Sequence, residues 1–285
     1  MEIMIEGKTK IIEGLDDPNK IRIRTKDSLT ANDAAIQATL PVAEDKTTQT
    51  IQIFHYLKQN DVPVAYISRN DETSFVAWHC KMLPIECVIR RQPYGSFIKR
   101  EPSYSSSQIF TPPKLEFFHK YAVVVGGEER KMIPEDKARE LYLRDGKWIG
   151  EVYTDPLIEP QEDSWSLYPA KLPRHEAKPL MNIVPVVDME TLEHIRTNLM
   201  VPCFELIEKA WKKFNVSLID MKIEVGWTKH SDELVIADVI DNDSWRIWPG
   251  GDPKNQLDKQ SFREGEDLSE VQKKYRIVTE YTKEF

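Results

Sequence analysis

The sequence has few cysteines and no run of apolar residues long enough to cross a membrane. Its three cysteines, Cys80, Cys87 and Cys203, lack C-x-x-C spacing, which argues against a disulfide framework or a zinc site. No stretch of about 18 apolar residues occurs, and the first residues lack the apolar segment of a signal peptide. We therefore expect reduced thiols and a cytoplasmic protein without a transmembrane helix.

The chain also lacks an excess of basic residues. Its net charge of −8 argues against binding to nucleic acid or to a membrane surface, because both depend on positive charge. Small phosphorylated molecules need only a local basic cluster and are not excluded. The 285 residues, of which 40% are hydrophobic and 30% charged, fit one large domain or two closely associated ones.

The usual phosphate-binding motifs are missing. There is no Walker A sequence and no G-x-G-x-x-G, and the H-R-D and D-F-G motifs of protein kinases are absent. Glu6-Gly7-Lys8-Thr9-Lys10 lies between apolar residues that alternate as in strands. Gly7 would let backbone N–H groups approach a phosphate, and the lysines would supply charge. The alternative is a plain hairpin with exposed lysines.

Hydrophobic periodicity predicts most of the regular structure. The expected strands are a β-meander over residues 3–25 and later strands at 62–68, 73–80, 86–91, 218–225 and 234–240. The expected helices cover residues 45–59, 135–143, 189–214 and 268–283, with Pro202 starting a new helix or kinking one. Residues 101–113, 155–185 and 241–267 are predicted to be irregular. This order indicates an α+β fold with two lobes, residues 1–85 and 86–285, and a cleft between them.

The segment from Leu218 to Arg263 carries the most informative charges. Lys222 and Glu224 are two residues apart on one predicted strand, so their side chains lie on the same face. Asp238 ends the next strand and could neutralise the lysine, or the two carboxylates could hold Mg²⁺ near phosphates. The alternative is a solvent-exposed face followed by an ordinary turn at residues 241–244.

Two further segments have the composition of ligand sites. Lys81-Met82-Leu83-Pro84-Ile85-Glu86 could offer its backbone to an adenine and Glu86 to a ribose, or it could be a buried linker between lobes. The segment from Arg90 to Arg100 is basic in an acidic chain and includes Gly95-Ser96. Arginine binds phosphate and carboxylate in bidentate fashion, so we expect an anion site there.

Taken in order, these segments resemble the phosphoribosylaminoimidazole-succinocarboxamide synthase family, also called SAICAR synthetase. The matching motifs are EGKTK at 6–10, MLPIE at 82–86, R-x-x-x-x-GS at 90–96, FIKR at 97–100, PPK at 112–114, DP at 155–156, LIDMKIEVG at 218–226, ADVIDNDSWRIWP at 237–249 and DKQSFR at 258–263. The resemblance omits residues 120–185, and its later motifs are most similar to the animal form, which is often fused to a carboxylase domain.

The resemblance implies a ligase of purine biosynthesis. It would use ATP to join the carboxylate of carboxyaminoimidazole ribotide (CAIR) to the amine of L-aspartate, through an acyl phosphate. It also implies a SAICAR synthase-like fold with a β-rich ATP-binding N-terminal lobe, an α/β C-terminal lobe and an ATP-grasp- or kinase-like cleft. A homo-oligomer, possible association with a carboxylase domain or another purine-pathway enzyme, and a cytoplasmic location are further expectations.

Residue roles follow from the matching positions. Lys222, Glu224 and Asp238 would be catalytic, with Glu224 and Asp238 holding Mg²⁺. The nucleotide would be held by Gly7, Lys8, Lys10, Lys81, Leu83 and Glu86. The other substrates would be held by Asp33, Arg90, Ser96, Asp155, Arg246, Lys259 and Arg263. A lysine that the family places in the middle of the chain corresponds to Lys120 or is absent.

Two other functions fit parts of the sequence. A two-lobed kinase would turn over ATP with its acceptor and ignore aspartate. A non-catalytic relative would have lost the charged residues of the site, but Lys10, Arg90, Lys222, Glu224, Asp238 and Arg246 are all present.

Overall fold

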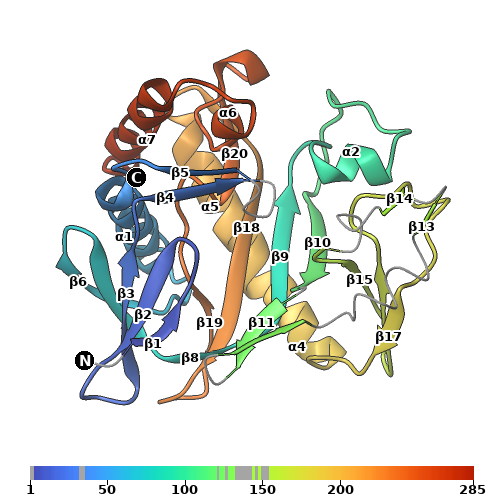
Figure 1. Ribbon diagram of the computed structural model, residues 1–285, viewed down its shortest axis with the longest axis horizontal. Coiled ribbons are helices and arrows are strands. Elements are labelled where there is room, and N and C mark those ends of the chain that lie inside the picture. Colours follow the sequence, from blue (N-terminus) through green and yellow to red (C-terminus); the bar gives the residue numbers. More distant parts are fainter. Residues whose placement is uncertain are drawn as a thin grey trace. The chain divides into compact units, whose positions relative to one another are not determined.

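The computed structural model describes residues 3–31, 36–120, 122–125, 128–131, 143–144, 147–148 and 154–285. The chain forms two compact units (Figure 1): residues 1–82 with 202–285, and residues 83–201. These units differ from the predicted functional lobes, 1–85 and 86–285, because residues 202–285 pack with the N-terminal segment. The division into nucleotide-binding and catalytic lobes remains a prediction.

The N-terminal part of the first unit is an antiparallel sheet with the strand order β1-β2-β3-β7-β6. The strands are β1 (Ile3–Glu6), β2 (Lys10–Gly14), β3 (Lys20–Thr25), β6 (Tyr66–Asp71) and β7 (Ser74–Trp78). In β3, Ile21 and Ile23 are buried while Arg22 and Arg24 pair with Glu13. This alternation confirms the predicted β-meander.

Two helices of the first unit pack against each other: α1 (Ala43–Gln59) and α7 (Leu268–Thr282). Asp27 lies at the N-terminal end of α1. Its Oδ1 accepts hydrogen bonds from the backbone N–H groups of Val42 (3.0 Å) and Ala43 (2.9 Å). These N–H groups have no partner within the helix, so Asp27 supplies the cap that Val42 cannot. A short hairpin, β4 (Ser28–Ala31) and β5 (Ile36–Thr39), precedes α1.

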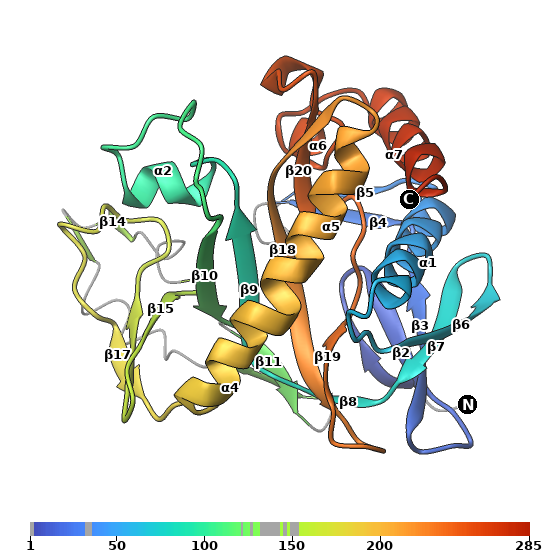
Figure 2. The same ribbon diagram turned by 180° about the vertical axis from the view of Figure 1, so that it is seen from behind.

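The long strand β18 (Val216–Thr228) organises the rest of the first unit. It pairs antiparallel with β20 (Trp245–Pro249) in its first half, and with β19 (Leu234–Ala237) and β8 (Cys80–Met82) in its second half. Helix α5 (Val201–Lys212) runs alongside β18 (Figure 2). Pro202 is the second residue of α5 and directly follows a π-helical segment (Ile195–Met200), so the helical run continues through the proline and no separate helix starts there.

The second unit contains an antiparallel sheet with the order β17-β16-β15-β10-β9. Its strands are β9 (Ile85–Arg90), β10 (Lys114–His119), β15 (Leu157–Pro160), β16 (Trp165–Tyr168) and β17 (Met181–Ile183). The last three correct the prediction that residues 155–185 are irregular. Each is only three or four residues long, too short for a clear alternation among the prolines and acidic residues of this segment.

The remaining elements are short. They are α2 (Ser96–Arg100), β11 (Ala122–Val125), β12 (Glu128–Lys131), β13 (Leu143–Arg144), β14 (Lys147–Trp148), α4 (Met189–His194), the π-helical segment η2 (Ile195–Met200), the 3₁₀ turn η3 (Pro253–Asn255) and α6 (Gln260–Arg263). The prediction of an irregular segment at 241–267 was therefore wrong for β20 and α6, while the helix predicted at 135–143 lies almost wholly outside the described residues.

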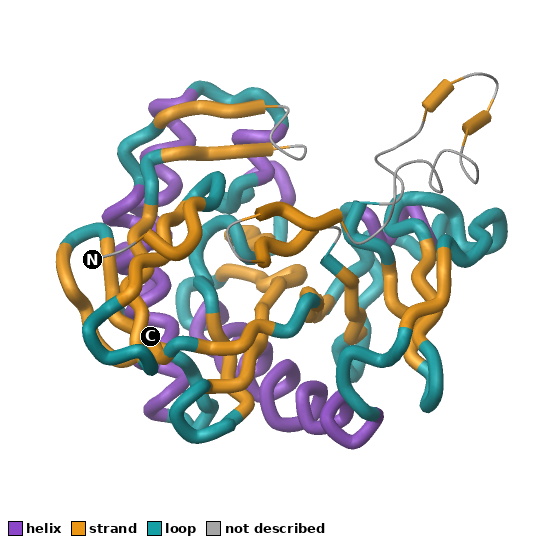
Figure 3. Tube along the Cα trace, turned by 60° about the horizontal axis from the view of Figure 1, so that its bottom comes forward, coloured by secondary structure: helices purple, strands orange, loops and turns teal. Residues whose placement is uncertain are grey.

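Helices and strands occur in both units (Figure 3), as the predicted α+β class requires. Within the described part of the chain, no helix is both long and apolar enough to cross a membrane. The three cysteines are free thiols, as predicted. The ATP-grasp- or kinase-like cleft remains a prediction.

Candidate active site

The second half of β18 carries a lysine and a glutamate on one face, as the sequence predicted. Lys222 Nζ donates to Glu224 Oε1 at 3.3 Å, which requires both side chains to lie on the same side of the strand. Glu224 is 8% exposed, whereas the side chain of Lys222 is 38% exposed. A carboxylate held in a largely buried position beside an accessible ammonium group suits the binding of a charged ligand rather than an ordinary solvent-facing strand.

Asp238 follows β19 and departs from the strand geometry. Glu224 pairs with Ala237 in the β18–β19 ladder, so Asp238 comes one residue after the partner of Glu224. Its φ of 64° lies in the left-handed region, which is uncommon for residues other than glycine. The side chain therefore leaves the alternating pattern of β19. Such backbone strain is concentrated at functional sites.

Lys10, from the hairpin of β1 and β2, contacts Asp238. Lys10 Nζ donates to Asp238 Oδ1, across a sequence separation of 228 residues. Lys10 begins β2, and Gly7 N–H donates to Lys10 O at 2.8 Å, which closes the loop that also contains Lys8. The predicted phosphate-binding motif and the predicted metal-binding aspartate are thus joined directly.

The donor set around Glu224 and Asp238 fits Mg²⁺. No cluster of three or more histidine, cysteine, aspartate or glutamate side chains with metal-ligand geometry occurs among the described residues. Mg²⁺ in nucleotide sites is usually held by only one or two carboxylates together with water and substrate phosphates. Each carboxylate has a lysine beside it, Lys222 or Lys10. Each ammonium group has three N–H donors, so it could also contact a phosphate.

Arg246 and Asp220 form a second charged pair on the β18–β20 ladder. The two residues are cross-strand partners, and Arg246 Nη1 donates to Asp220 Oδ2.

Burial and the neighbouring Arg246 lower the pKa of Arg263. Burial also raises the pKa of Asp258 to about 6, although its carboxylate accepts hydrogen bonds from Gln260 N and Ile247 N. Two of the three predicted substrate-binding arginines, Arg246 and Arg263, therefore lie close together in the first unit.

A buried turn beside this pair contains residues that the sequence analysis gave no role. Asp243 accepts hydrogen bonds from Lys46 Nζ (2.8 Å), Lys259 Nζ (2.9 Å) and Tyr275 Oη. Burial disfavours the charges on Lys46 and Asp243, but the attraction between them outweighs burial, raising the pKa of Lys46 and lowering that of Asp243. Lys46 and Tyr275 lie on helices far away in sequence, so no local pattern indicates them.

In the second unit, two arginines of the basic segment share one buried glutamate. Glu116 Oε2 accepts from Arg90 Nε at 2.7 Å, and Glu116 Oε1 accepts from Arg100 Nη2 at 2.5 Å. Arg90 is 4% exposed and Arg100 1%. Burial raises the pKa of Glu116, but Arg90 and Arg100 outweigh it, so the pKa lies below its usual value. The sequence analysis missed Glu116, which lies on the adjacent strand β10.

The remaining predicted residues are spread over both units. Lys81 is exposed on β8, Leu83 is buried, and Glu86 is half-buried on β9. Ser96 begins α2 after Gly95, whose φ of 60° favours glycine. Asp155 has a φ of 46°, and Lys120 N–H donates to Pro84 O at 2.9 Å. Asp33 lies outside the described residues.

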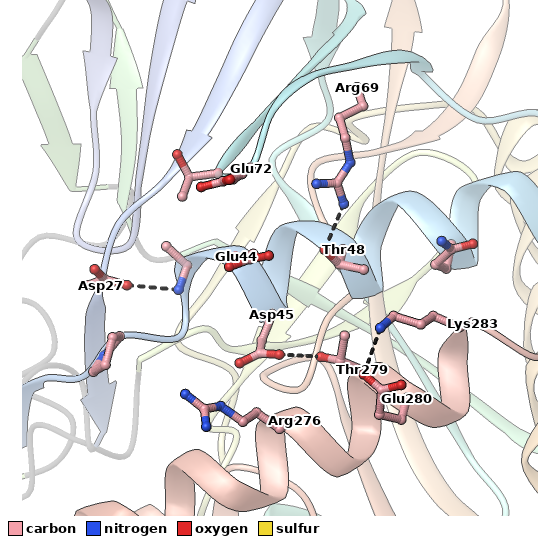
Figure 4. A pocket seen from close by; sticks show the side chains of 14 residues that line it. Asp27, Glu44, Asp45, Thr48, Arg69, Glu72, Arg276, Thr279, Glu280 and Lys283 are labelled. Carbon is pink, nitrogen blue, oxygen red and sulfur yellow. Dashed lines mark hydrogen bonds and ion pairs between the residues drawn. The ribbon is translucent and has the colours of Figure 1, made fainter.

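A groove of about 870 Å³ lies elsewhere in the first unit. It is bordered by the start of α1, the turn between β6 and β7, and α7 (Figure 4). Its charged side chains belong to Asp27, Glu44, Asp45, Arg69, Glu72, Arg276, Glu280 and Lys283. None of the predicted site residues lines it.

The fold is that of solved SAICAR synthetases. A synthase from Ehrlichia chaffeensis superimposes with a TM-score of 0.73 over 100% of this chain and 99% of that chain, at 20% identity. A SAICAR synthetase (type-2) in complex with ADP gives a TM-score of 0.71 over 98% of this chain and 97% of that chain, at 22% identity. These likenesses define the class of fold.

Sequence comparison places the chain in a family. The model of the SAICAR synthetase family matches residues 3–281. The synthase of Chloroflexus aurantiacus is 32% identical over 98% of this chain and 95% of its own length. The bifunctional carboxylase/synthetase of Rattus norvegicus is 35% identical over 94% of this chain, but over only 53% of its own length. The chain belongs to the SAICAR synthetase family, as its motifs predicted, and spans about half the length of the animal relatives.

Proposed function

We propose that this chain is an ATP-dependent ligase that joins CAIR and L-aspartate to form SAICAR, ADP and phosphate. The observation that carries the proposal is the convergence of Lys10, Lys222, Glu224 and Asp238 in a chain that the family model covers almost completely. Relatives that carry the name phosphoribosylaminoimidazole-succinocarboxamide synthase support the reaction. A related structure in complex with ADP supports nucleotide binding.

The proposed reaction has two steps. A carboxylate oxygen of CAIR attacks the γ-phosphorus of ATP, so an O–P bond forms and the bond to ADP breaks. The amine of aspartate then attacks the acyl carbon; a C–N bond forms, phosphate leaves, and the amine loses a proton. Both steps bring anions together, so the protein must contribute positioning and charge neutralisation.

The residues of the first unit would act on the transferred phosphoryl group. Lys8 and Lys10, on the loop closed by Gly7, would hold the ATP phosphates. Mg²⁺ bound by Glu224 and Asp238 would neutralise phosphate charge and orient the reacting carboxylate. Lys222, the more exposed member of its pair, would stabilise charge on the transferred group.

The remaining roles concern the organic parts of the substrates. Arg246, Lys259 and Arg263 would bind the anionic groups of CAIR or aspartate, as would Arg90 and Ser96 in the second unit. Lys81, Leu83 and Glu86 would hold adenine and ribose. Asp33 and Asp155 would help to place the imidazole or aspartate.

Location and assembly are part of the proposal. We expect a cytoplasmic enzyme that acts on small molecules and forms a homo-oligomer. The rat relative combines carboxylase and synthetase in one name, which supports an association of this chain with a carboxylase.

A coupled assay of ADP release tests the proposed function. We expect ADP release with ATP, Mg²⁺, CAIR and aspartate together, and SAICAR formed in equal amount. SAICAR formation should disappear when aspartate or CAIR is omitted. ADP release that ignores aspartate and yields a phosphorylated acceptor would instead identify a kinase.

A further inference from the structure

The Asp243 cluster links the predicted substrate lysine, Lys259, to two helices outside the recognised motifs. Three donors meet on one carboxylate: Lys46 from α1 and Lys259 at the start of α6 on Oδ2, and Tyr275 from α7 on Oδ1. Lys46 Nζ also lies 3.8 Å from Asp241 Oδ2. Charges of alternating sign thus run from Asp241 through Lys46 and Asp243 to Lys259.

The turn that carries Asp243 is held rigidly from several directions. Ser244 N–H donates to Asp241 O, and Asp243 N–H donates to Asp241 Oδ1, each at 2.8 Å. Asn242 N–H donates to Gln49 Oε1 of α1 at 2.8 Å. Gln49 Nε2 in turn donates to Tyr275 O of α7 at 3.0 Å. The position of the carboxylate is therefore determined by the packing of α1 and α7.

Lys46 and Lys259 are both largely buried, Lys46 more completely than Lys259. The side chain of Lys46 is 3% exposed and that of Lys259 9%. Lys46 is thus an internal counter-ion, and Lys259 is the less buried of the two lysines. Asp243 Oδ2 accepts from both ammonium groups, so the position of Lys259 depends on a carboxylate oxygen that Lys46 also binds. Burial together with Asp243 raises the pKa of the Tyr275 hydroxyl well above its usual value, so this group remains a donor.

We propose that Asp243, held by Lys46 and Tyr275, is a positioning residue that fixes the ammonium group of Lys259 for an anionic group of the ribotide or aspartate. This inference rests on the proposed function and deepens it, because it assigns α1 and α7 to the substrate site. Tight placement of a binding group matters because small displacements weaken substrate positioning strongly.

The test compares Tyr275→Phe and Asp243→Asn with the control Tyr281→Phe. Tyr281 lies on the same helix α7 and contacts Trp211 and Phe214 rather than a carboxylate. We expect Asp243→Asn to raise KM for CAIR or aspartate about ten-fold or more, and Tyr275→Phe to raise it less, because charged hydrogen bonds are lost. KM for ATP should change less than about two-fold, and Tyr281→Phe should match the wild type. Equal effects on ATP and the other substrates, or lower thermal stability with unchanged KM values, would overturn the proposal.

A second measurement does not depend on activity. Lysine acylation by an N-hydroxysuccinimide ester, followed by peptide mass spectrometry, reports how accessible each amine is to the reagent. Lys259 should react several-fold faster in Asp243→Asn than in the wild type, because its amine is no longer held by the Asp243 carboxylate, and unchanged labelling would contradict the positioning role. Wild-type protein that makes no SAICAR would refute the proposed function, whereas the labelling separately decides whether Asp243 holds Lys259.

Discussion

Replacing Glu116 with glutamine should strongly destabilise the second unit. The carboxylate bonds to Arg90 at 2.7 Å and to Arg100 at 2.5 Å, and the exposed fractions of the two arginines are 4% and 1%. Glutamine keeps the shape and one acceptor but removes the negative charge that the two buried guanidinium groups share. Loss of one partner from a buried ion pair costs about 3–5 kcal/mol, so we expect a loss of roughly 3 kcal/mol.

Glu159→Gln provides the matched control in the same unit. Glu159 also pairs with an arginine, Arg174 at 2.6 Å, but its side chain is 49% exposed. Exposed pairs contribute about 0–1 kcal/mol. Urea denaturation of both variants, followed by intrinsic tryptophan fluorescence, to which the buried Trp165 of this unit contributes, should show a large shift of the midpoint only for Glu116→Gln. Equal shifts for both variants would refute the reasoning.

The pH dependence of the free energy of unfolding tests the role of Glu116 independently. Burial raises the pKa of Glu116, but Arg90 and Arg100 outweigh burial and hold it below the unfolded value of 4.5. The contribution of Glu116 to stability is therefore complete above pH 4.5 and is lost as the pH falls through the lower, folded pKa. Glu116→Gln should lose this acid-dependent part, and a wild-type stability that does not fall below pH 4.5 would contradict the assignment.

Two further predictions concern the first unit. Burial raises the pKa of Asp258 from 3.8 to about 6. The contribution of Asp258 to stability is therefore complete below pH 3.8 and is lost, by up to about 3 kcal/mol, as the pH rises through 6. In urea denaturation between pH 4 and 8, Asp258→Asn should lack this part of the pH dependence. Arg246→Ala removes one hydrogen-bond donor to Asp220 and should mainly raise KM for CAIR or aspartate in the ADP-release assay; a change confined to ATP would contradict its placement.

Much of the fold was predictable because its signals are local. The β-meander and helices α1 and α7 have a clear period over many residues, and the structure contains them close to the predicted bounds. Strands β15, β16 and β17 were missed because each is stabilised by its neighbours in the sheet, as in the pairing of Leu157 with Tyr168 and of Leu167 with Met181. A strand of three or four residues carries too little pattern to be recognised alone.

In the candidate site, too, residues related by local spacing were predicted, whereas residues that meet only in the folded chain were missed. Lys222 and Glu224 were placed on one face by their spacing, and the contact between them confirms it. Lys46, Glu116 and Tyr275 were missed because their roles depend on contacts made only in the folded chain. Tyr275 meets Asp243 across 32 residues and Lys46 meets it across 197, separations at which no periodicity connects the partners.

The most direct test of the central claim is the turnover of Glu224→Gln compared with Glu233→Gln in the ADP-release assay. Glu224 is largely buried beside Lys222, whereas Glu233 is exposed just before β19. Loss of the proposed metal ligand should lower turnover by at least about a hundred-fold without changing the thermal midpoint, while Glu233→Gln should behave like the wild type. Wild-type turnover in Glu224→Gln would contradict the account.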